Sequence, residues 1–492
     1  MVELVFQKTL DYLNKMPKVQ RKAYGQFFTC PETAKFMAGL FTIPQKESIS
    51  ILDPGAGTGL LTIALLERIE HESHIKNITI TCYENDSNIL TLLKDNLCLI
   101  SSLSEKNITY NIIARNYILH QSVDYNTGVD KEKADLIIGN PPYLKIGKEA
   151  PEAKAMLDVC RGAPNLYFLF ATMSLFNLKY MGEMVYIVPR SWTSGTYFAA
   201  FRNKFLKQGA LTYIHLFTAR NKVFYHENIL QETIIIKVVK SEKKPKNITI
   251  STSNNHSDFL NKTTIEVPYN HVVQGLDNYV YLMTNKIEVQ AISKLKTFTN
   301  TLPSLGLRMK TGITVDFRYK ESLRDTPFDD CIPLFSPHHI KNGEIDFPLR
   351  QKYEYLLTDQ KSLKQPNSNY LFVKRFTSKE EYRRLQCAIY LSKNFSEYRE
   401  ISTHNKINFI CGVAPLSKAI VYGLYVLFNS TLYDIYYRVL NGSTQVNATE
   451  INNAFPMPTL DIIEYMGNKL MRKKGLTVKL CDSILESCLS RK

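Results

Sequence analysis

The sequence Asp135-Leu-Ile-Ile-Gly-Asn-Pro-Pro-Tyr143 is the most informative segment of this chain. Its three consecutive aliphatic residues predict a short strand that is buried on both faces. The two prolines fix φ and remove two backbone donors, so the turn after the strand is stiff. Ligands of open α/β sheets bind at the carboxyl ends of parallel strands. We therefore expect the amide of Asn140 and the ring of Tyr143 to project into a binding site. The alternative is a Pro-Pro turn with a surface asparagine.

A glycine-rich turn precedes this segment. A strand predicted over residues 49–53 enters Pro54-Gly-Ala-Gly-Thr-Gly59, and apolar spacing predicts a helix over residues 60–69. The glycines let the backbone turn tightly and approach a ligand, and the helix N-terminus offers N–H groups. Such a loop serves a dinucleotide or another adenosine compound, and the residues leave this choice open.

The next segments continue an alternation of strands and helices. A strand predicted over residues 78–84 ends in Glu84, an acid that is placed to accept hydrogen bonds from ribose hydroxyls. A helix is predicted over residues 86–100 and a strand over residues 108–113. The order β-α-β-α-β-β predicts an α/β fold, a Rossmann-like parallel sheet with helices on both faces.

The chain begins with two predicted helices. The first has apolar spacing over residues 6–16. The second, over residues 31–40, follows the unusual run Gly-Gln-Phe-Phe-Thr that ends at Thr29. Thr29 is predicted to cap this helix, with Glu32 as its reciprocal partner.

Composition limits the class of protein. A chain of 492 residues is too long for one core, so two or three domains are expected. The net charge of +15 favours a polyanionic partner. Nine scattered cysteines, without a zinc-type spacing, predict reduced thiols in the cytoplasm and no metal site. No apolar run has membrane-spanning length and the first residues lack the features of a signal peptide, so no membrane association is expected.

The motifs together resemble the S-adenosylmethionine-dependent amino-methyltransferases. The run that ends at Thr29, the glycine loop 53–59 and the Asn-Pro-Pro-Tyr segment occur in the order found in the TaqI-like, or gamma, group of adenine-N6 DNA methyltransferases. This resemblance implies S-adenosyl-L-methionine as the cofactor. Two positions depart from the pattern: Asn116 stands where the family usually has an Asp, and Cys30 where a Pro commonly follows the Thr.

The resemblance also implies a role for each motif residue. An amide oxygen can still accept a hydrogen bond from the cofactor adenine, so Asn116 keeps this role. The implied cofactor site consists of Phe28 and Thr29 beside the methionine part, Asp53, Gly55, Gly57 and Gly59 behind the cofactor, Glu84 at the ribose, Asn116 at the adenine and Asn140 at the methyl group.

The implied catalytic loop is Asn140-Pro141-Pro142-Tyr143. The amine of adenine is a poor nucleophile, because its lone pair is delocalised into the ring. The side-chain oxygen of Asn140 and the backbone oxygen of Pro141 would each accept one N–H bond and favour a tetrahedral nitrogen. A target base inside a duplex must be swung out, and Tyr143 is a candidate aromatic face to hold it. The resemblance to the TaqI-like group implies that Phe198, or the adjacent Tyr197, is the second face. The alternative for Phe198 is a core residue at a helix start.

Residues 151–285 are expected to complete the sheet, which gives a cofactor-binding catalytic domain over residues 1–285. The predicted elements are a helix over 166–179, strands over 183–189, 211–217 and 232–239, a polar hairpin tip over 240–246 and an irregular transition over 251–285.

Residues 286–492 are expected to form a mixed α+β target-recognition domain. A helix is predicted over 287–295, an amphipathic helix over 421–437 and a basic amphipathic helix over 466–492, with short strands between. Basic and aromatic residues that suit phosphate contacts and base readout interleave here, although a solvated basic surface is the alternative for each. These residues are Arg308, Lys310, Arg318, Tyr319, Lys320, His338, His339, Lys341, Lys374, Arg375, Lys379, Arg383 and Arg384.

Three segments in this half, 310–318, 372–376 and 441–450, resemble the target-recognition part of PstI/BsuBI-type modification methylases. The resemblance implies a palindromic site such as CTGCAG. We therefore expect a site-specific enzyme that methylates adenine N6 in double-stranded DNA. Its expected setting is the cytoplasm, as a monomer paired with a restriction endonuclease on a separate chain. The alternatives are methylation of a protein glutamine or an RNA nitrogen, and a catalytically silent DNA-binding module.

Overall fold

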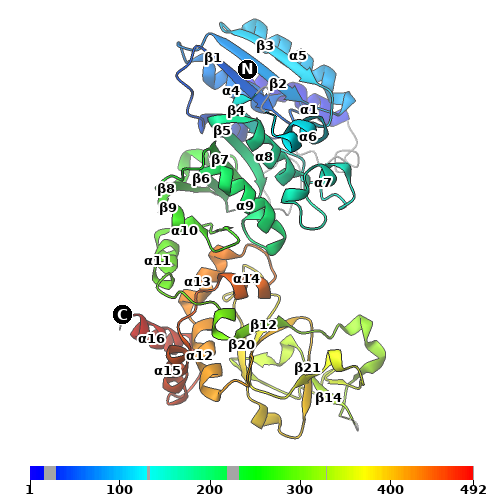
Figure 1. Cartoon of the computed structure of the whole chain (residues 1–492), viewed down its shortest axis with the longest axis vertical. Helices are drawn as coiled ribbons and strands as arrows, with labels where there is room; N and C mark the ends of the chain where they lie inside the picture. The colour runs from blue at the N-terminus through cyan, green and yellow to red at the C-terminus, as the bar shows by residue number, and fades with distance from the viewer. Residues whose placement is uncertain (16–28, 130–132, 219–231, 328–329, 491–492) are drawn as a thin grey trace. The chain divides into compact units, whose positions relative to one another are not determined.

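The computed structural model describes residues 1–15, 29–129, 133–218, 232–327 and 330–490. The predicted motif residues 25–28, Phe28 included, lie outside these ranges. The chain divides into two compact units. The first contains Met1–Thr193 and Tyr197–Thr284, and the second contains Ser194–Thr196 and Asn285–Lys492 (Figure 1).

The first unit is built on a mixed sheet that has nine strands in the described residues, in the order β3-β2-β1-β4-β5-β7-β6-β8-β9. Its strands are β1 (Ser48–Asp53), β2 (Asn77–Tyr83), β3 (Asn107–Ile113), β4 (Ala134–Gly139), β5 (Leu178–Pro189), β6 (Gly209–Phe217), β7 (Thr233–Lys240), β8 (Asn247–Ser253) and β9 (Thr263–Pro268). Strands β3, β2, β1, β4 and β5 are parallel, and β7 is antiparallel to both of its neighbours. All six residues of β4 are buried, as its aliphatic run predicts.

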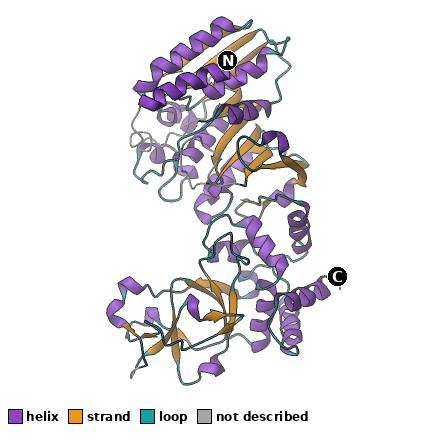
Figure 2. Ribbon diagram, turned by 180° about the vertical axis from the view of Figure 1, so that it is seen from behind, coloured by secondary structure: helices purple, strands orange, loops and turns teal. Residues whose placement is uncertain are grey.

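Helices cover both faces of this sheet (Figures 1 and 2). One group packs together around α4 and the other around α8. This arrangement confirms the predicted α/β fold class. The longer helices are α1 (Val2–Lys15), α3 (Pro31–Gly39), α4 (Leu60–Glu70), α5 (Ser87–Leu103), α6 (Tyr117–Thr127), α8 (Leu166–Asn177) and α9 (Ala199–Gln208), and the short ones are α7 (Pro151–Ala155) and α10 (Tyr269–Val272).

Two predictions about these helices were wrong. The N-cap of α3 is Cys30, without a side-chain capping bond, and not Thr29. Helix α6 lies between β3 and β4, where no helix was expected. Only Tyr117 and Ile118 of α6 are buried, so its sequence carries little of the apolar periodicity that marks a helix.

The end of the first unit also differs from expectation. Residues 240–246 do not form a hairpin tip, because β6 lies between β7 and β8. Residues 251–285 are not an irregular transition: β8 pairs with β6, β9 pairs with β8, and the two extend the main sheet. A small ladder of β10 (Val273–Gln274) and β11 (Tyr279–Val280) follows.

The second unit combines two sheets with a group of helices. The first sheet has the order β12-β22-β19-β20-β16-β15 and the second the order β13-β17-β14-β21-β18. Its strands are β12 (Leu307–Thr311), β13 (Leu323–Arg324), β14 (Ile332–Phe335), β15 (Ile340–Lys341), β16 (Glu344–Ile345), β17 (Tyr355–Leu356), β18 (Gln365–Pro366), β19 (Tyr370–Lys374), β20 (Cys387–Tyr390), β21 (Glu400–Thr403) and β22 (Ile407–Gly412).

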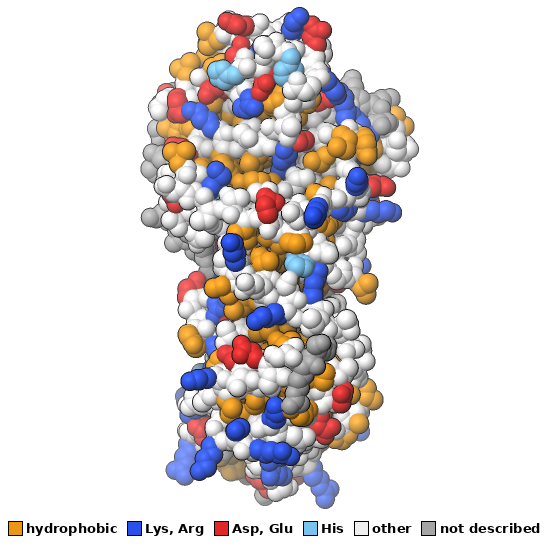
Figure 3. Space-filling view, turned by 90° about the vertical axis from the view of Figure 1, so that its left-hand side faces the viewer, with side chains coloured by type: hydrophobic (Ala, Val, Ile, Leu, Met, Phe, Trp, Pro, Cys, Tyr) orange, Lys and Arg blue, Asp and Glu red, His pale blue; other side chains and the backbone are white. Residues whose placement is uncertain are grey.

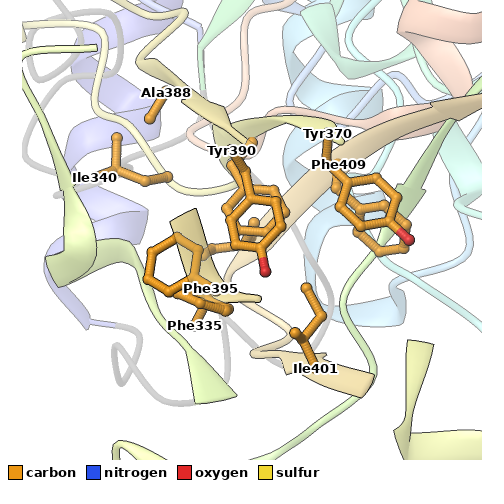
Figure 4. Close-up of a cluster of buried hydrophobic side chains, with 10 residues drawn as sticks. Phe335, Ile340, Tyr370, Ala388, Tyr390, Phe395, Ile401 and Phe409 are labelled. Atoms are coloured by element: carbon orange, nitrogen blue, oxygen red, sulfur yellow. The ribbon is translucent and has the colours of Figure 1, made fainter. Parts of the chain in front are cut away.

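An aromatic cluster forms the core between these strands. The rings of Phe372 and Tyr390 stack with centroids 5.0 Å apart, and those of Tyr390 and Phe395 stack at 5.1 Å. Phe335 packs against all three of these rings (Figure 4). Stacked and edge-on pairs of this kind stabilise a core beyond the burial of their area.

The helices of the second unit correct two predictions. The expected helix over 421–437 is two helices that meet at Ser430, whose side chain caps the second. The expected helix over 466–492 is also two, α15 and α16. The bounds are α11 (Lys286–Leu295), α12 (Lys418–Phe428), α13 (Thr431–Leu440), α14 (Ala448–Ala454), α15 (Leu460–Met471) and α16 (Val478–Leu489). Across the residues searched, every helix is too short or too polar to cross a membrane.

Candidate functional site

A cavity of about 250 Å³ opens beside the carboxyl ends of β1, β2 and β4. An ordered water needs only roughly 10–15 Å³ of such space, so the cavity is large enough for a ligand of many atoms. Its lining is formed by Thr9, Thr29, Pro54, Gly55, Ala56, Gly57, Thr58, Leu60, Leu61, Tyr83, Glu84, Asn85, Arg115, Asn116, Tyr117, Asn140, Pro142, Leu144, Glu152, Leu166 and Phe170.

The glycine loop forms one wall of this cavity. Gly57 has a φ of 53° and Gly59 a φ of 85°, in the left-handed region that favours glycine. A Cβ atom on Gly59 would also lie 2.9 Å from Cδ1 of Leu93. Gly55 has neither constraint, since a Cβ there would meet only the Phe170 ring, at 3.8 Å. The packing around position 55 therefore does not by itself require a glycine there.

Asp53 supports the loop from behind. It is fully buried and does not line the cavity. Its Oδ2 accepts a hydrogen bond from the Thr62 hydroxyl at 2.8 Å, and its Oδ1 accepts one from the Gly55 N–H at 3.4 Å. Burial raises the pKa of Asp53 to about 7.

Glu84 faces the cavity at the end of β2. Its Oε2 accepts from the Gly57 N–H at 2.8 Å and its Oε1 from the Asp86 N–H at 2.8 Å. Burial raises the pKa of this carboxyl, and the backbone donors oppose that effect. A carboxylate has about four acceptor positions, so Glu84 can accept a further hydrogen bond from a ligand hydroxyl.

The Asn-Pro-Pro-Tyr loop and the N-terminal motif meet at the cavity. Nδ2 of Asn140 donates to Oγ1 of Thr29 at 3.2 Å, across 111 residues of sequence. Thr29, Asn140 and Pro142 all line the cavity, whereas Pro141 is buried and does not. The bond to Thr29 turns the Asn140 amide so that its oxygen points away from that hydroxyl.

The two predicted aromatic faces, Tyr143 and Phe198, share a neighbour. Tyr143 is buried, and its hydroxyl donates to the Ile187 carbonyl at 2.9 Å. Its ring meets Tyr167 edge-on at 6.3 Å, and Phe198 lies 6.4 Å from the same ring. Phe198 is half-buried at the N-cap of α9, and neither residue lines the cavity.

Sequence reasoning missed several residues that line the cavity. The rings of Tyr83 and Tyr117 meet edge-on at 4.9 Å, and Phe170 lies 5.4 Å from Tyr117. The carboxylate of Glu152 accepts from Nδ2 of Asn116 at 2.8 Å. Nothing in the sequence around Glu152 marks it, because it reaches the site from the short helix α7. Among the residues that the structure describes, no group of three or more potential metal ligands was found.

In the second unit, the three segments that carry the resemblance converge. Oδ1 of Asn408 accepts from the Thr311 hydroxyl at 2.8 Å, and Nδ2 of Asn408 donates to the Val446 carbonyl at 2.8 Å. The Val446 N–H in turn donates to the Arg375 carbonyl at 2.6 Å. Arg375 lies over the half-exposed ring of Phe376, at 5.4 Å from its centroid.

The basic residues predicted to read DNA differ in accessibility. Arg384 is fully buried and donates to the Ser443 carbonyl at 2.6 Å, and His339 is buried against Glu354. These two side chains belong to the core and cannot meet a macromolecule. Other Lys and Arg side chains gather on the surface of the second unit (Figure 3).

Known proteins resemble the chain over most of its length. A family described as the Eco57I restriction-modification methylase matches residues 63–224. The type II methyltransferase M.PstI of Providencia stuartii is 34% identical over 465 residues, which is 92% of this chain and 90% of the relative. M.BsuBI of Bacillus subtilis is 32% identical over 90% of this chain and 89% of the relative.

A solved structure shares the fold. The type IIL restriction-modification enzyme MmeI, in complex with DNA, has a TM-score of 0.55 at 13% identity, and the match covers 96% of this chain and 73% of that one. At this identity the likeness shows the fold alone.

Proposed function

We propose that this chain, which belongs to the type II DNA methyltransferases of restriction-modification systems, methylates adenine at N6 in double-stranded DNA. Its cofactor is S-adenosylmethionine. The observation that carries the proposal is the position of Asn140. It stands on a stiff loop at the wall of the glycine-loop cavity and is fixed by Thr29.

The cavity residues fit the cofactor. Glu84 offers acceptors for two ribose hydroxyls, and the rings of Tyr83, Tyr117 and Phe170 offer apolar surface for a purine. Thr29 and Asn140 would lie at the methionine end. When bound, the sulfonium of the cofactor supplies the electrophilic methyl group.

Asn140 and Pro141 would prepare the nucleophile. With Nδ2 of Asn140 donating to Thr29, Oδ1 would accept one N–H of the target amine through an oxygen lone pair, and the Pro141 carbonyl would accept the other. Two acceptors favour a tetrahedral nitrogen with its lone pair directed at the methyl group. Neither group is a strong base, so the proton leaves after the nitrogen has become cationic.

The target base would have to leave the duplex to reach this loop. Tyr143 and Phe198 are the aromatic faces that we propose for it. Tyr167, which contacts both rings, would hold them at a fixed separation.

The second unit is the proposed reader of the DNA sequence. Support comes from the exposed Phe376 beside Arg375, and from the 79% exposure of Phe317 next to Asp316, which pairs with His404. The backbone carbonyl of Asn405, next to His404, accepts a hydrogen bond from Nη1 of Arg375 at 2.9 Å, so the two exposed rings lie beside segments that are joined to each other. Arginine and aromatic side chains are suited to contacts with base edges.

The test of the proposal is transfer of labelled methyl from S-adenosylmethionine to unmethylated plasmid DNA, followed by nucleoside analysis. N6-methyladenine is expected, and 5-methylcytosine or N4-methylcytosine would refute the proposal. Asn140→Ala is expected to lower turnover by at least roughly 10²- to 10³-fold while duplex binding persists. Transfer only to RNA or to a protein glutamine would assign the site to those substrates instead.

Two further features belong to the proposal. We expect the protein to act as a monomer, since each catalytic event handles one adenine, and sedimentation with a cognate duplex checks this. We also expect a separate endonuclease that cleaves the same site. DNA methylated by this protein should resist that nuclease.

A further inference from the structure

Asn116, which the family pattern assigns to the cofactor adenine, is occupied by two protein contacts. Its Oδ1 accepts from the Leu119 N–H at 3.1 Å and thereby caps α6. Its Nδ2 donates to Oε1 of Glu152 at 2.8 Å. These two hydrogen bonds fix both the oxygen and the nitrogen of the Asn116 amide. The oxygen therefore has only one lone pair left, and the helix end determines its direction.

Glu152 has the acceptor capacity that Asn116 lacks. It stands in the first turn of α7, is half-buried and lines the cavity together with Asn116, Tyr117 and Phe170. A carboxylate offers about four acceptor positions over two oxygens. Within the described ranges, Asn116 provides the one hydrogen bond found for Glu152, and it goes to Oε1. Oε2 therefore remains as an acceptor at the cavity wall.

We propose that the carboxylate of Glu152 accepts a hydrogen bond from the 6-amino group of the cofactor adenine. Asn116 is then a positioning residue that orients the Glu152 carboxylate. The adenine amino group is a neutral donor, and a charged acceptor gives it a stronger bond than an amide oxygen would. The proposal rests on S-adenosylmethionine as the cofactor and not on the identity of the methylated base.

A purely structural role for Glu152 makes a different prediction. The bond to Asn116 also ties α6 to α7, and a glutamine at position 152 could keep that tie through its own oxygen. The amide nitrogen of that glutamine would then face the adenine amino group. Because both groups are hydrogen-bond donors, no hydrogen bond could form between them. Glu152→Gln therefore separates the two roles.

The experiment is calorimetric binding of two ligands without DNA. One is S-adenosylhomocysteine, and the other is its analogue in which hydrogen replaces the 6-amino group. The wild type is expected to bind the amino compound at least roughly tenfold more tightly, because a hydrogen bond to a charged group contributes about 1.5–3 kcal/mol. In Glu152→Gln the preference should fall below about twofold, while the Kd of the deamino analogue stays unchanged.

The matched control is Glu149→Gln. Glu149 lies three residues away, pairs with Lys154 in solvent and does not line the cavity, so its variant should discriminate like the wild type. Equal binding of both ligands by the wild type would overturn the proposal, whatever the variants do. A Glu152→Gln protein that keeps the full preference, or that weakens both ligands equally, would overturn it as well. Because no DNA is present, these results are independent of which base is methylated.

Discussion

At the scale of single residues, we expect Thr29 to affect methyl transfer through the side chain of Asn140. It is buried, and its hydroxyl accepts the bond that orients the Asn140 amide. Thr29→Val keeps the size of the side chain and removes that acceptor. We expect kcat to fall roughly 10- to 100-fold, because a small misplacement of a reacting group is costly. Rapid-quench methyl transfer measures this fall.

The control for this prediction is Thr29→Ser, which keeps the hydroxyl and should recover most of the turnover. If the serine and valine variants lose activity equally, the missing methyl group and not the hydrogen bond would be the cause.

Asp53 gives a prediction about pH. Burial raises the pKa of Asp53 from 3.8 to about 7. Between these two pH values the carboxyl is therefore protonated in the folded state and ionised in the unfolded state. The contribution of this carboxyl to stability is therefore fully present below pH 3.8. This stabilising contribution is lost progressively as the pH rises from 3.8 through about 7, and at higher pH the carboxyl no longer makes stability depend on pH. Relative to the wild type, Asp53→Asn should become more stable between pH 4 and pH 7.

Urea unfolding of both proteins at several pH values tests this difference. The asparagine can still accept from the Gly55 N–H, and its amino group can donate to the Thr62 hydroxyl, so the loop should be preserved. A difference in the free energy of unfolding that does not vary with pH would show that Asp53 ionises normally.

The aromatic pair can be tested with a fluorescent base. Tyr143→Ala and Phe198→Ala should each lower kcat/KM by roughly 5- to 150-fold, since stacking contributes about 1–3 kcal/mol per base. In a duplex with 2-aminopurine at the target, the emission of the bound complexes should also differ from that of the wild type. Equal emission from all three proteins would show that these rings do not hold the base.

At the scale of elements, two glycines of the glycine loop differ in what the fold requires of them. Gly59 has a left-handed backbone and a close neighbour, whereas Gly55 has neither. Gly59→Ala places a Cβ in left-handed backbone and 2.9 Å from Leu93, so a loss of roughly 1–3 kcal/mol of stability is expected. Gly55→Ala meets only Phe170, at 3.8 Å, and should fold as the wild type does. Thermal melts of the two variants provide the comparison. Equal melting temperatures would contradict the assigned strain.

Strands and the turns after them could be predicted from the sequence because their signals are local. The buried run of β4 and the prolines after it identify a strand and a loop without any tertiary information. The same holds for the glycine loop, where Gly57 and Gly59 have positive φ. Their roles toward the cofactor and the base stay predictions.

Contacts between distant elements could not be predicted. Helix α6 escaped notice because only two of its eleven residues are buried, and Glu152 because only the fold brings α7 beside Asn116. Strands β8 and β9 alternate polar and apolar residues, but their polar composition made them resemble a linker. The sequence also does not show whether a basic side chain is exposed: Arg384 was expected to contact DNA but is fully buried.

At the scale of the whole molecule, we expect the first unit to bind the cofactor and the second unit to recognise the DNA sequence. Every residue that lines the glycine-loop cavity belongs to the first unit, whereas Arg375, Phe376 and the segments joined to them belong to the second. A substitution in the second unit should therefore change DNA affinity and leave cofactor affinity unchanged.

Arg375→Ala is the sharpest test of this division. The variant should bind a cognate duplex more weakly by about 1–3 kcal/mol, as loss of a base contact does, with an unchanged Kd for S-adenosylhomocysteine. Fluorescence anisotropy and calorimetry measure the two affinities. Lys473→Ala, on the exposed turn between α15 and α16, is the matched loss of one positive charge. If Lys473→Ala weakens binding as much as Arg375→Ala, and equally for cognate and unrelated duplexes, only the net charge of +15 attracts DNA and Arg375 reads no base.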